Sequence, residues 1–244
     1  AATRILAADG RVRGVELADG TVVEAPVVIA SPGREGADWL AEQAHALGLP
    51  LCNNAVDIGV RVECPAPIMD RLTDALYEAK LVYHTKAFGD TIRTFCMNPH
   101  GEVTTECYGD VVTVNGHSYA DARTSYTNFA VLVSQRFTEP FNDPIAYGRS
   151  IAKLANLLGD GILVQRLVDL KAGRRSTHER IAQSLAQPTL PGATPGDLSA
   201  VLPYRHLTDI IEFQISAGKV HLSLMIDCFD CFDCFDCFDM VDAT

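Results

Sequence analysis

Residues 5–36 read ILAADGRVRGVELADGTVVEAPVVIASPGREG and place two turn signals ahead of a short apolar run. Asp9-Gly10 and Asp19-Gly20 predict tight hairpin turns, because the glycine supplies the positive φ that such turns need. The segment between them alternates apolar and polar residues, as a half-buried strand does. Residues 27–30, VVIA, form a continuous apolar run that predicts a strand covered on both faces. The order predicts two hairpins that lead into a buried strand.

A glycine turn and a helix are expected after this strand. The apolar run ends at Ser31-Pro32-Gly33, where the backbone is expected to turn sharply. Residues 37–47 then predict a helix, with Gly48 just past its end and Pro50 two residues later as stop signals.

The composition is that of an ordinary globular protein with one large or two small domains. The chain has 244 residues, of which 48% are hydrophobic and 21% are charged. No apolar run reaches the ~18 residues of a membrane span, and no basic patch with interleaved aromatic residues indicates nucleic-acid binding. The start of the chain lacks a signal-peptide core, and the cysteine spacing indicates no disulfide framework. We therefore expect a cytoplasmic protein that binds a small molecule rather than a membrane or a nucleic acid.

The middle of the chain predicts a β-rich region. Residues 58–62, IGVRV, are typical of a strand, and residues 65–79 carry apolar positions at helical spacing. Five more strand candidates follow, with turn signals at residues 98–101 and at Asn115-Gly116. These candidates are residues 81–83, 91–97, 102–106, 110–115 and 128–134.

Two helix-start signals mark the next part of the chain. Asp143 followed by Pro144 predicts an N-cap and the first residue of a long helix. Ser176 and Glu179 have the spacing of a capping box, which predicts that Ser176 caps a second helix. Two further elements are expected, a strand over residues 162–168 and a helix over residues 205–213.

The tail repeats the tripeptide Cys-Phe-Asp four times, from Cys228 to Asp239. Cysteines at every third residue superficially match the spacing of iron–sulfur ligands. The repeat has no glycine or proline to fold a loop around a cluster, and its regularity favours replication slippage or a shifted reading frame. We therefore predict no metal site and a disordered, low-complexity tail over residues 214–244. Metal binding by the four tail cysteines stays open as an alternative.

Several blocks of the chain, taken together, resemble one group of proteins. Residues 54–63 read NAVDIGVRVE, residues 93–103 read RTFCMNPHGEV and residues 114–121 read VNGHSYAD. Shorter blocks are FTEP at 137–140, GRRST at 173–177 and TPGDL at 194–198. Over roughly residues 4–213 the chain resembles uncharacterised bacterial FAD-dependent dehydrogenases, within the NAD(P)/FAD-dependent oxidoreductases.

The resemblance implies an α+β fold related to an α/β parent. Residues 1–50 would form part of a Rossmann-type FAD-binding domain with its β-meander, and residues 51–213 an inserted β-rich substrate-side domain with helices. The family's N-terminal GxGxxG strand–turn–helix unit and its C-terminal segment do not occur in this sequence, which also lacks an initial methionine. We therefore interpret the chain as an internal fragment.

The resemblance assigns FAD to the intact parent protein and leaves the use of NAD(P)H open. Amide groups at the start of the predicted helix 37–47 would face phosphate, and a plain strand-to-helix turn is the alternative. The turn that touches the flavin nucleotide in the family corresponds here to Ala30, Ser31, Pro32, Gly33, Arg34 and Gly36.

Two residues are candidates for catalysis. Cys96 could act as a redox or nucleophilic group beside a flavin if a nearby His or Arg lowers its pKa. A small buried hydrophobic residue is the alternative for this cysteine. His117 could donate a proton, although a lone histidine in a β-rich region is more often structural.

Five residues are candidates for substrate binding. Asn98 lies in a turn that could approach the flavin ring, and Tyr119 could hydrogen-bond the substrate. Arg174 and Arg175 could clamp an anionic substrate through their planar guanidinium groups, with surface solvation as the alternative. Arg93 completes this group.

The resulting hypothesis is a fragment of an FAD-dependent dehydrogenase that acts on an unidentified organic substrate, with the flavin carrying the electron chemistry. The alternative is a non-catalytic binding module or a degenerate product that cannot bind FAD alone. We expect the isolated chain to be inactive. A truncated sheet would expose residues 27–30, which predicts self-association through the open edge.

Overall fold

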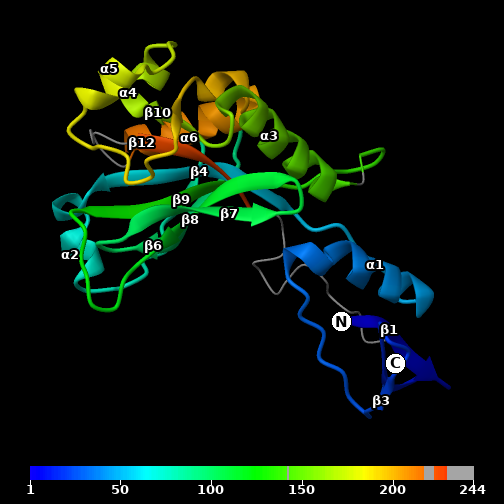
Figure 1. The fold of residues 1–244 in the computed structure, drawn as a ribbon. Helices are drawn as coiled ribbons and strands as arrows, with labels where there is room; N and C mark the ends of the chain where they lie inside the picture. The colour runs from blue at the N-terminus through cyan, green and yellow to red at the C-terminus, as the bar shows by residue number, and fades with distance from the viewer. Residues whose placement is uncertain (142, 217–222, 230–244) are drawn as a thin grey trace. The chain divides into compact units, whose positions relative to one another are not determined.

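The computed structural model describes residues 1–141, 143–216 and 223–229, and it has an α+β fold (Figure 1). The α+β class predicted from the sequence is therefore confirmed. The described part of the chain divides into two compact units, with residues 1–54 in the first and the described residues from 55 to 229 in the second. Among the helices in the described ranges, none has the length and apolar character of a membrane-spanning segment.

The first unit begins with a three-stranded antiparallel meander. Both predicted hairpin turns form, and Asp9 and Gly10 in the first turn have φ values of 54° and 71°. These left-handed values explain why Asp-Gly is suited to the position. The strands are β1 (Ala2–Ala8), β2 (Arg11–Leu17) and β3 (Val22–Glu24).

The apolar run at residues 27–30 is not a strand, so the prediction of a buried strand there is wrong. Val27 and Ile29 are 71% and 90% exposed. A strand forms only where a neighbouring backbone takes up its N–H and C=O groups. No strand within the described ranges pairs with this run, so it stays irregular.

The predicted helix forms after the glycine turn. The 3-10 helix η1 (Arg34–Gly36) leads into α1 (Ala37–Ala46), and Gly48 beyond it has a φ of 71°. Two hydrogen bonds tie α1 to strand β1. Gln43 Oε1 accepts the backbone N–H of Ile5 at 2.9 Å, and Trp39 Nε1 donates to the carbonyl of Thr3 at 3.0 Å.

The second unit is built on a seven-stranded sheet in the order β11-β10-β12-β4-β9-β6-β5. All neighbours are antiparallel except β10 and β11. A separate two-stranded antiparallel hairpin consists of β7 (Glu102–Tyr108) and β8 (Val111–His117). The sheet strands are β4 (Val56–Pro65), β5 (Val82–His84), β6 (Thr91–Asn98), β9 (Tyr126–Gln135), β10 (Leu163–Arg166), β11 (Thr194–Pro195) and β12 (Ser223–Phe229).

Two long helices, α3 (Pro144–Gly159) and α6 (Tyr204–Ser216), cover one face of this sheet (Figure 1). Asp143 caps α3 as predicted, because its side chain accepts the backbone N–H of Ala146 at 2.9 Å. Alternate apolar residues of β4 and β9 meet apolar residues of both helices in a single core. This core includes Ile58, Val60, Val62, Val131, Val133, Ile151, Ala155, Ile210 and Phe213.

The β7–β8 hairpin lies against the opposite face. Val103 and Val114 of the hairpin pack with Ile162 and Val164 in a second apolar cluster. On this face β4 places charged residues, because side chains alternate between the two faces of a strand. Both Arg61 and Glu63 are fully buried there. A strand with one apolar face and one buried polar face therefore forms the centre of the unit.

Two helix predictions need correction. Residues 65–79, expected as a helix from their apolar spacing, form only the 3-10 helix η2 (Ala66–Ile68) and the single turn α2 (Asp70–Thr73), and Leu76 in this range is exposed. The capping box is also wrong. Thr177, and not Ser176, caps α5 (His178–Ala182), because the Ser176 hydroxyl donates to Asp169. The remaining short helices are α4 (Leu167–Lys171) and η3 (Leu198–Ala200).

Two other predictions differ from the structure. Asn115-Gly116 lies inside strand β8 and is not a turn. Residues 204–216 continue helix α6 and residues 223–229 form β12, so the expectation of disorder from residue 214 onward is wrong for these segments. The rest of the Cys-Phe-Asp repeat, and with it the metal-binding alternative, lies outside the described residues.

Candidate functional site

Residues 96–101, which comprise the end of β6 and the turn that leads to β7 and are called the 96–101 turn below, have an unusual backbone. Cys96 and His100 have φ values of 43° and 51°, in the left-handed region that side chains other than glycine seldom adopt. The register between β6 and β9 also shifts between Phe95 and Asn98. Strained residues of this kind persist where surrounding contacts fix them, and they cluster at functional sites.

The buried guanidinium group of Arg61 holds this turn in place through hydrogen bonds. Arg61 Nη1 donates to the carbonyl oxygen of Cys96 at 3.1 Å and to Asn128 Oδ1 at 2.9 Å. Arg61 Nη2 donates to Asn115 Oδ1 at 3.3 Å. Asn98 Nδ2 donates to the same Cys96 carbonyl at 2.7 Å. The strained segment is therefore held by a network that spans three strands and the hairpin.

His100 is held at both of its ring nitrogens. Nδ1 lies 3.1 Å from the carbonyl oxygen of Thr124, and Nε2 lies 3.5 Å from Oδ1 of Asp70. A carbonyl oxygen only accepts hydrogen bonds, so Nδ1 contacts Thr124 as a donor when it carries a proton, whereas the contact with Asp70 is longer than an ordinary hydrogen bond. The two contacts hold the ring of His100 at the wall of a pocket.

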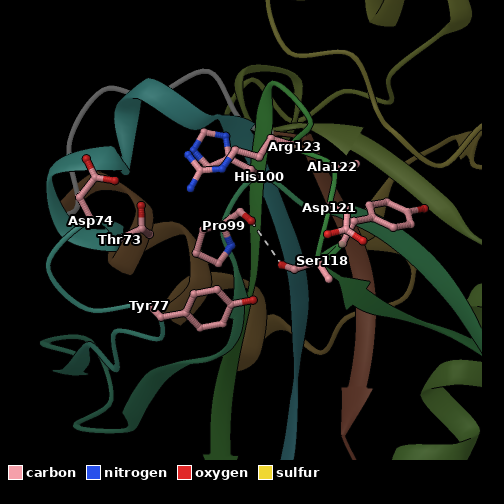
Figure 2. A pocket seen from close by; sticks show the side chains of 11 residues that line it. Thr73, Asp74, Tyr77, Pro99, His100, Ser118, Asp121, Ala122 and Arg123 are labelled. Atoms are coloured by element: carbon pink, nitrogen blue, oxygen red, sulfur yellow. Dashed lines mark hydrogen bonds between the residues drawn. The ribbon is translucent and has the colours of Figure 1, made fainter.

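A pocket of about 670 Å³ opens beside this turn. Figure 2 shows His100 and Pro99 of the turn facing Tyr77 and the segment that follows β8. The volume lies within the range of about 300–1,000 Å³ that small-molecule sites occupy. Its lining residues are Thr73, Asp74, Tyr77, Pro99, His100, Ser118, Tyr119, Ala120, Asp121, Ala122 and Arg123.

Tyr119 and Glu102 form a hydrogen-bonded pair at this pocket. Tyr119 lines the pocket, and its hydroxyl donates to Oε1 of Glu102. This hydrogen bond raises the pKa of the Tyr119 hydroxyl, and the negative charge of Glu102 adds to the effect. The ring of His117 lies edge-on to that of Tyr119, with centroids 4.8 Å apart. The pair offers a proton donor and a proton acceptor in direct contact.

A second carboxylate is buried under the hairpin. Burial raises the pKa of Glu63, although hydrogen bonds from the Thr189 hydroxyl and backbone oppose this, and the charge of Glu102 raises it further. Thr189 Oγ1 in turn accepts the backbone N–H of Val103 at 2.9 Å. Glu63 therefore fixes the hairpin residue that follows Glu102.

The structure brings some of the sequence candidates together and leaves others apart. The Asn98 side chain donates a hydrogen bond to the Cys96 carbonyl oxygen in the turn. Tyr119 lines the pocket beside this turn. His117 contacts Tyr119 but does not line the pocket. Arg93 forms an ion pair with Asp57 and lies over the Phe95 ring, away from the residues that line the pocket.

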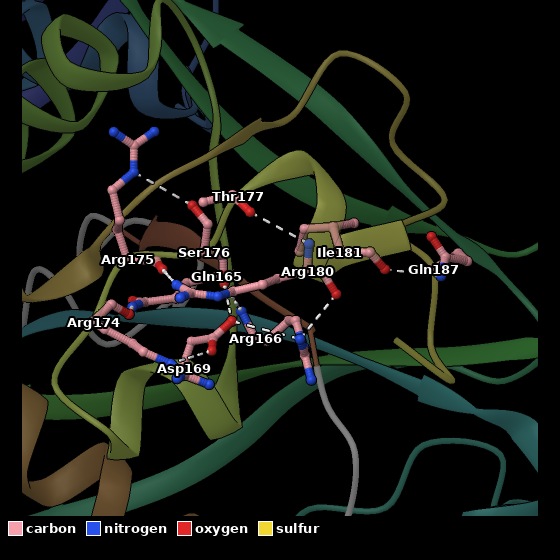
Figure 3. A network of polar contacts seen from close by, with 10 residues as sticks. All are labelled: Gln165, Arg166, Asp169, Arg174, Arg175, Ser176, Thr177, Arg180, Ile181 and Gln187. Atoms are coloured by element: carbon pink, nitrogen blue, oxygen red, sulfur yellow. Dashed lines mark hydrogen bonds and ion pairs between the residues drawn. The ribbon is translucent and has the colours of Figure 1, made fainter. Parts of the chain in front are cut away.

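Arg174 and Arg175 do not converge on a common point. Arg174 Nε donates to the buried carboxylate of Asp169 at 2.9 Å, and Ser176 Oγ donates to the same group at 2.9 Å. Figure 3 shows the Arg175 guanidinium on the other side of this network, pointing away from Asp169. Its Nε donates to the carbonyl of Ser176 at 3.5 Å. Arg174 therefore anchors the chain around Asp169.

Asp169 is the centre of this second polar network. Burial alone would raise the pKa of its carboxyl group, but hydrogen bonds from Ser176 and Arg174 and the charge of Arg166 outweigh burial and lower it. The Ser176 hydroxyl also accepts the backbone N–H of Arg166 at 3.0 Å. The network joins β10, α4 and the loop before α5, which is a structural role.

The predicted cofactor segment lies in the first unit. Ala30, Ser31 and Gly33 are exposed, Pro32 is half-buried, and Arg34 begins η1 with a side chain outside the described part. Gly33 has a φ of 66° and open space where a Cβ would stand. A Cβ on Gly36 would meet Pro32 Cβ at 2.3 Å, so that glycine serves internal packing. The N-cap residue of α1, Gly36, provides no side-chain cap, and the start of a helix favours an anion such as phosphate.

Three residues of the site were missed from the sequence: Arg61, Glu102 and Arg123. Arg61 interrupts the apolar run IGVRV, and a charge within such a run is a signal that could have been followed. The other two lie among polar residues and carry no local signal. Within the described ranges, no three His, Cys, Asp or Glu side chains are grouped to hold a metal ion.

Residues 55–219 match the model of a family described as "FAD-dependent protein, C-terminal domain-like". The match covers more than half of the chain and contains the 96–101 turn, the pocket and the Arg61 network. No curated protein matches the sequence.

Proposed function

Because the chain belongs to the FAD-dependent protein C-terminal domain-like family, we propose that it is part of an FAD-dependent oxidoreductase whose substrate binds to residues 55–219. The 96–101 turn supports this assignment most directly. Two non-glycine residues of the turn are left-handed, a buried arginine binds the carbonyl group of the first, Cys96, and the turn forms one wall of the 670 Å³ pocket. A rigid, strained turn at the edge of a pocket is typical of a binding or catalytic site.

The chemistry of the pocket is that of positioning and proton transfer. When bound, the flavin supplies the acceptor for the electrons of the substrate. Glu102 accepts the hydrogen bond of the Tyr119 hydroxyl. A substrate O–H or N–H group that donates to the Tyr119 oxygen can therefore lose its proton to that oxygen while Tyr119 passes its own proton to Glu102. In this role Glu102 is the proton acceptor and Tyr119 the residue in contact with substrate.

The residues that would hold the phosphates of FAD are those of the predicted cofactor segment. The N-cap residue of α1, Gly36, provides no side-chain cap, and the positive end of the helix favours an anion. Gly33 is exposed beside η1 and leaves room for close approach. We place the phosphates at residues 31–37 on these grounds.

A charge test at Gly33 examines this proposal. The purified chain is titrated with FAD, followed by flavin absorbance and by co-elution on a size-exclusion column. Asn and Asp both tolerate the left-handed φ of Gly33, and a Cβ there has open space. Gly33→Asp places a negative charge beside the phosphates and should weaken FAD binding at least tenfold. Gly33→Asn has the same shape without the charge and should bind as the wild type does.

Two outcomes contradict the proposal. Equal FAD affinity of the two variants would mean that the phosphates do not lie at Gly33. A wild-type chain that binds no FAD would instead support the alternative, a non-catalytic protein whose family relationship does not describe its activity.

A further inference from the structure

We propose that the pocket beside the 96–101 turn binds a zwitterionic α-amino acid, with Arg123 taking the carboxylate and Asp121 the ammonium group. The inference rests on the proposed function in one respect, since it treats this pocket as the substrate site. It goes beyond that function by naming the chemical class of the ligand.

Three charged side chains in the pocket lack a protein partner. Within the part of the chain that the structure describes, Asp74, Asp121 and Arg123 make no side-chain hydrogen bond or ion pair, although they line one pocket. Figure 2 shows Asp74 and Asp121 on opposite sides of the pocket. The other charged groups nearby are engaged, since Asp70 faces His100 and Glu102 accepts from Tyr119.

The charged side chains without a protein partner include both carboxylates and a guanidinium group. Such a lining favours a ligand that carries both a positive and a negative charge. Arg123 presents a planar fork of donors that matches a carboxylate. His100 also lines the pocket, but both of its ring nitrogens already face Thr124 and Asp70. Arg123 is therefore the group available to bind a carboxylate.

Both anchors come from one short segment of the chain. Asp121 and Arg123 follow β8 and line the same pocket. An α-amino acid carries the two complementary charges, ammonium and carboxylate, in a single ligand. A carboxylate or an amine alone would form an ion pair with only one of these two groups, so it should bind less tightly than a ligand that carries both charges.

Another part of the pocket lining is suited to the side chain of the amino acid. Tyr77 is 65% exposed and lines the pocket together with Pro99. An aromatic ring and a proline ring offer apolar surface to a hydrocarbon or aromatic group. A ligand anchored at Arg123 and Asp121 could bury its side chain against this wall, so we select L-phenylalanine as the probe.

Three probes separate the contributions of the two charges. L-phenylalanine carries both groups, 3-phenylpropionate only the carboxylate and 2-phenylethylamine only the ammonium. Binding to the full chain is measured by isothermal titration calorimetry in the absence of FAD. We expect L-phenylalanine to bind at least tenfold more tightly than either analogue. Three similar affinities, or no binding of L-phenylalanine, would overturn the inference.

Two substitutions on the exposed lining assign the roles. Arg123→Gln should weaken L-phenylalanine and 3-phenylpropionate at least tenfold and leave 2-phenylethylamine unchanged. Asp121→Asn should weaken L-phenylalanine and 2-phenylethylamine and leave 3-phenylpropionate unchanged. Arg71→Gln is the matched control, because Arg71 is an exposed arginine that does not line the pocket. An equal loss for all three probes in either variant would contradict the assignment.

The absence of FAD keeps this test separate from the test of the proposed function. A chain that binds L-phenylalanine with the expected pattern but no FAD retains the amino-acid site and loses the flavin assignment. A chain that binds FAD but not L-phenylalanine retains the flavin assignment and loses the amino-acid site.

Discussion

Arg61 Nη1 donates a hydrogen bond to the carbonyl oxygen of Cys96 across 3.1 Å, although the two residues lie on different strands of the sheet. The guanidinium group is fully buried, so its positive charge is stabilised by the oxygen atoms that surround it. These oxygen atoms belong to Cys96 of the turn, to Asn128 of β9 and to Asn115 of the hairpin. The contact therefore couples the interior of the sheet to the wall of the pocket.

Gly116→Ala should disrupt this network. A Cβ on Gly116 would meet Asn98 Nδ2 at 2.1 Å, Asn128 Oδ1 at 2.3 Å and Arg61 Nη1 at 2.6 Å. The hairpin must move away or the buried polar groups must lose partners, so we expect the free energy of unfolding to fall by about 3 kcal/mol. Urea denaturation followed by circular dichroism measures the change.

Gly192→Ala is the control for this substitution, since its Cβ would meet nothing within 4 Å. It should leave the free energy of unfolding within about 0.5 kcal/mol of the wild type. If Gly116→Ala also leaves the free energy of unfolding unchanged, the Arg61 network does not depend on close approach of the hairpin.

Asp169→Asn should weaken the second polar network in a pH-dependent way. The pKa of Asp169 is lower in the folded protein than its ordinary value of 3.8. Its stabilisation is therefore complete above about pH 4 and is lost as pH falls through the lower folded value. We expect a loss of about 2 kcal/mol at pH 7, with a smaller difference from the wild type near pH 3, measured by urea denaturation at both pH values.

The matched control is Asp160→Asn. Asp160 is an exposed residue with a φ of 49° at the end of α3, a position that asparagine also tolerates. A difference between wild type and Asp169→Asn that stays constant from pH 7 to pH 3 would count against the charge of Asp169.

His206 and Asp209 of α6 should have opposite effects on the free energy of unfolding as the pH falls. Burial lowers the pKa of His206 to about 4, with a smaller contribution from Arg205 that Asp90 opposes. Burial raises the pKa of Asp209 to about 6, and Asp90 adds to this while Thr85 and Arg205 oppose it. As pH falls from 6 to 4, the unfolded chain gains the His206 proton first, which lowers stability. The folded chain gains the Asp209 proton first, which raises stability.

Single substitutions should separate these two opposing effects. Between pH 6 and pH 4, Asp209→Asn should lose stability more steeply than the wild type as pH falls, and His206→Gln should lose it less steeply. Each difference in slope is at most about 1.4 kcal/mol per pH unit. Thermal or urea unfolding at pH 4, 5 and 6 measures the slopes, and the double variant should return to the wild-type slope. Parallel profiles for all four proteins would refute the opposition.

Local sequence patterns were sufficient to predict the elements whose backbone hydrogen bonds form between residues close together in the sequence. The Asp-Gly turns, helix α1 and the Asp143 cap each depend on residues a few positions apart, and all three were predicted. The strand at residues 58–62 was also recognised, because the apolar face of β4 follows the period of a strand.

Long-range contacts explain the predictions that were wrong. Asn-Gly favours a turn, but Gly116 is required inside β8 because it lies against the Arg61 network. Ser176 has the local signature of an N-cap, but buried Asp169 takes its hydroxyl. Arg61 is separated from Asn128 by 67 positions and from Asn115 by 54, so no local window could reveal the network.

Strand β12 lies between β10 and β4 in the sheet although it is the last element described. Val60 pairs with Ile226, so most of the chain must be synthesised before this ladder can close. Pairing between such distant segments raises contact order and slows folding. During translation β4 would leave the ribosome before β12 is made. One of its backbone edges would then have no partner strand and would be prone to aggregation. The yield of folded protein should therefore depend on chaperones that shield β4 until synthesis is complete.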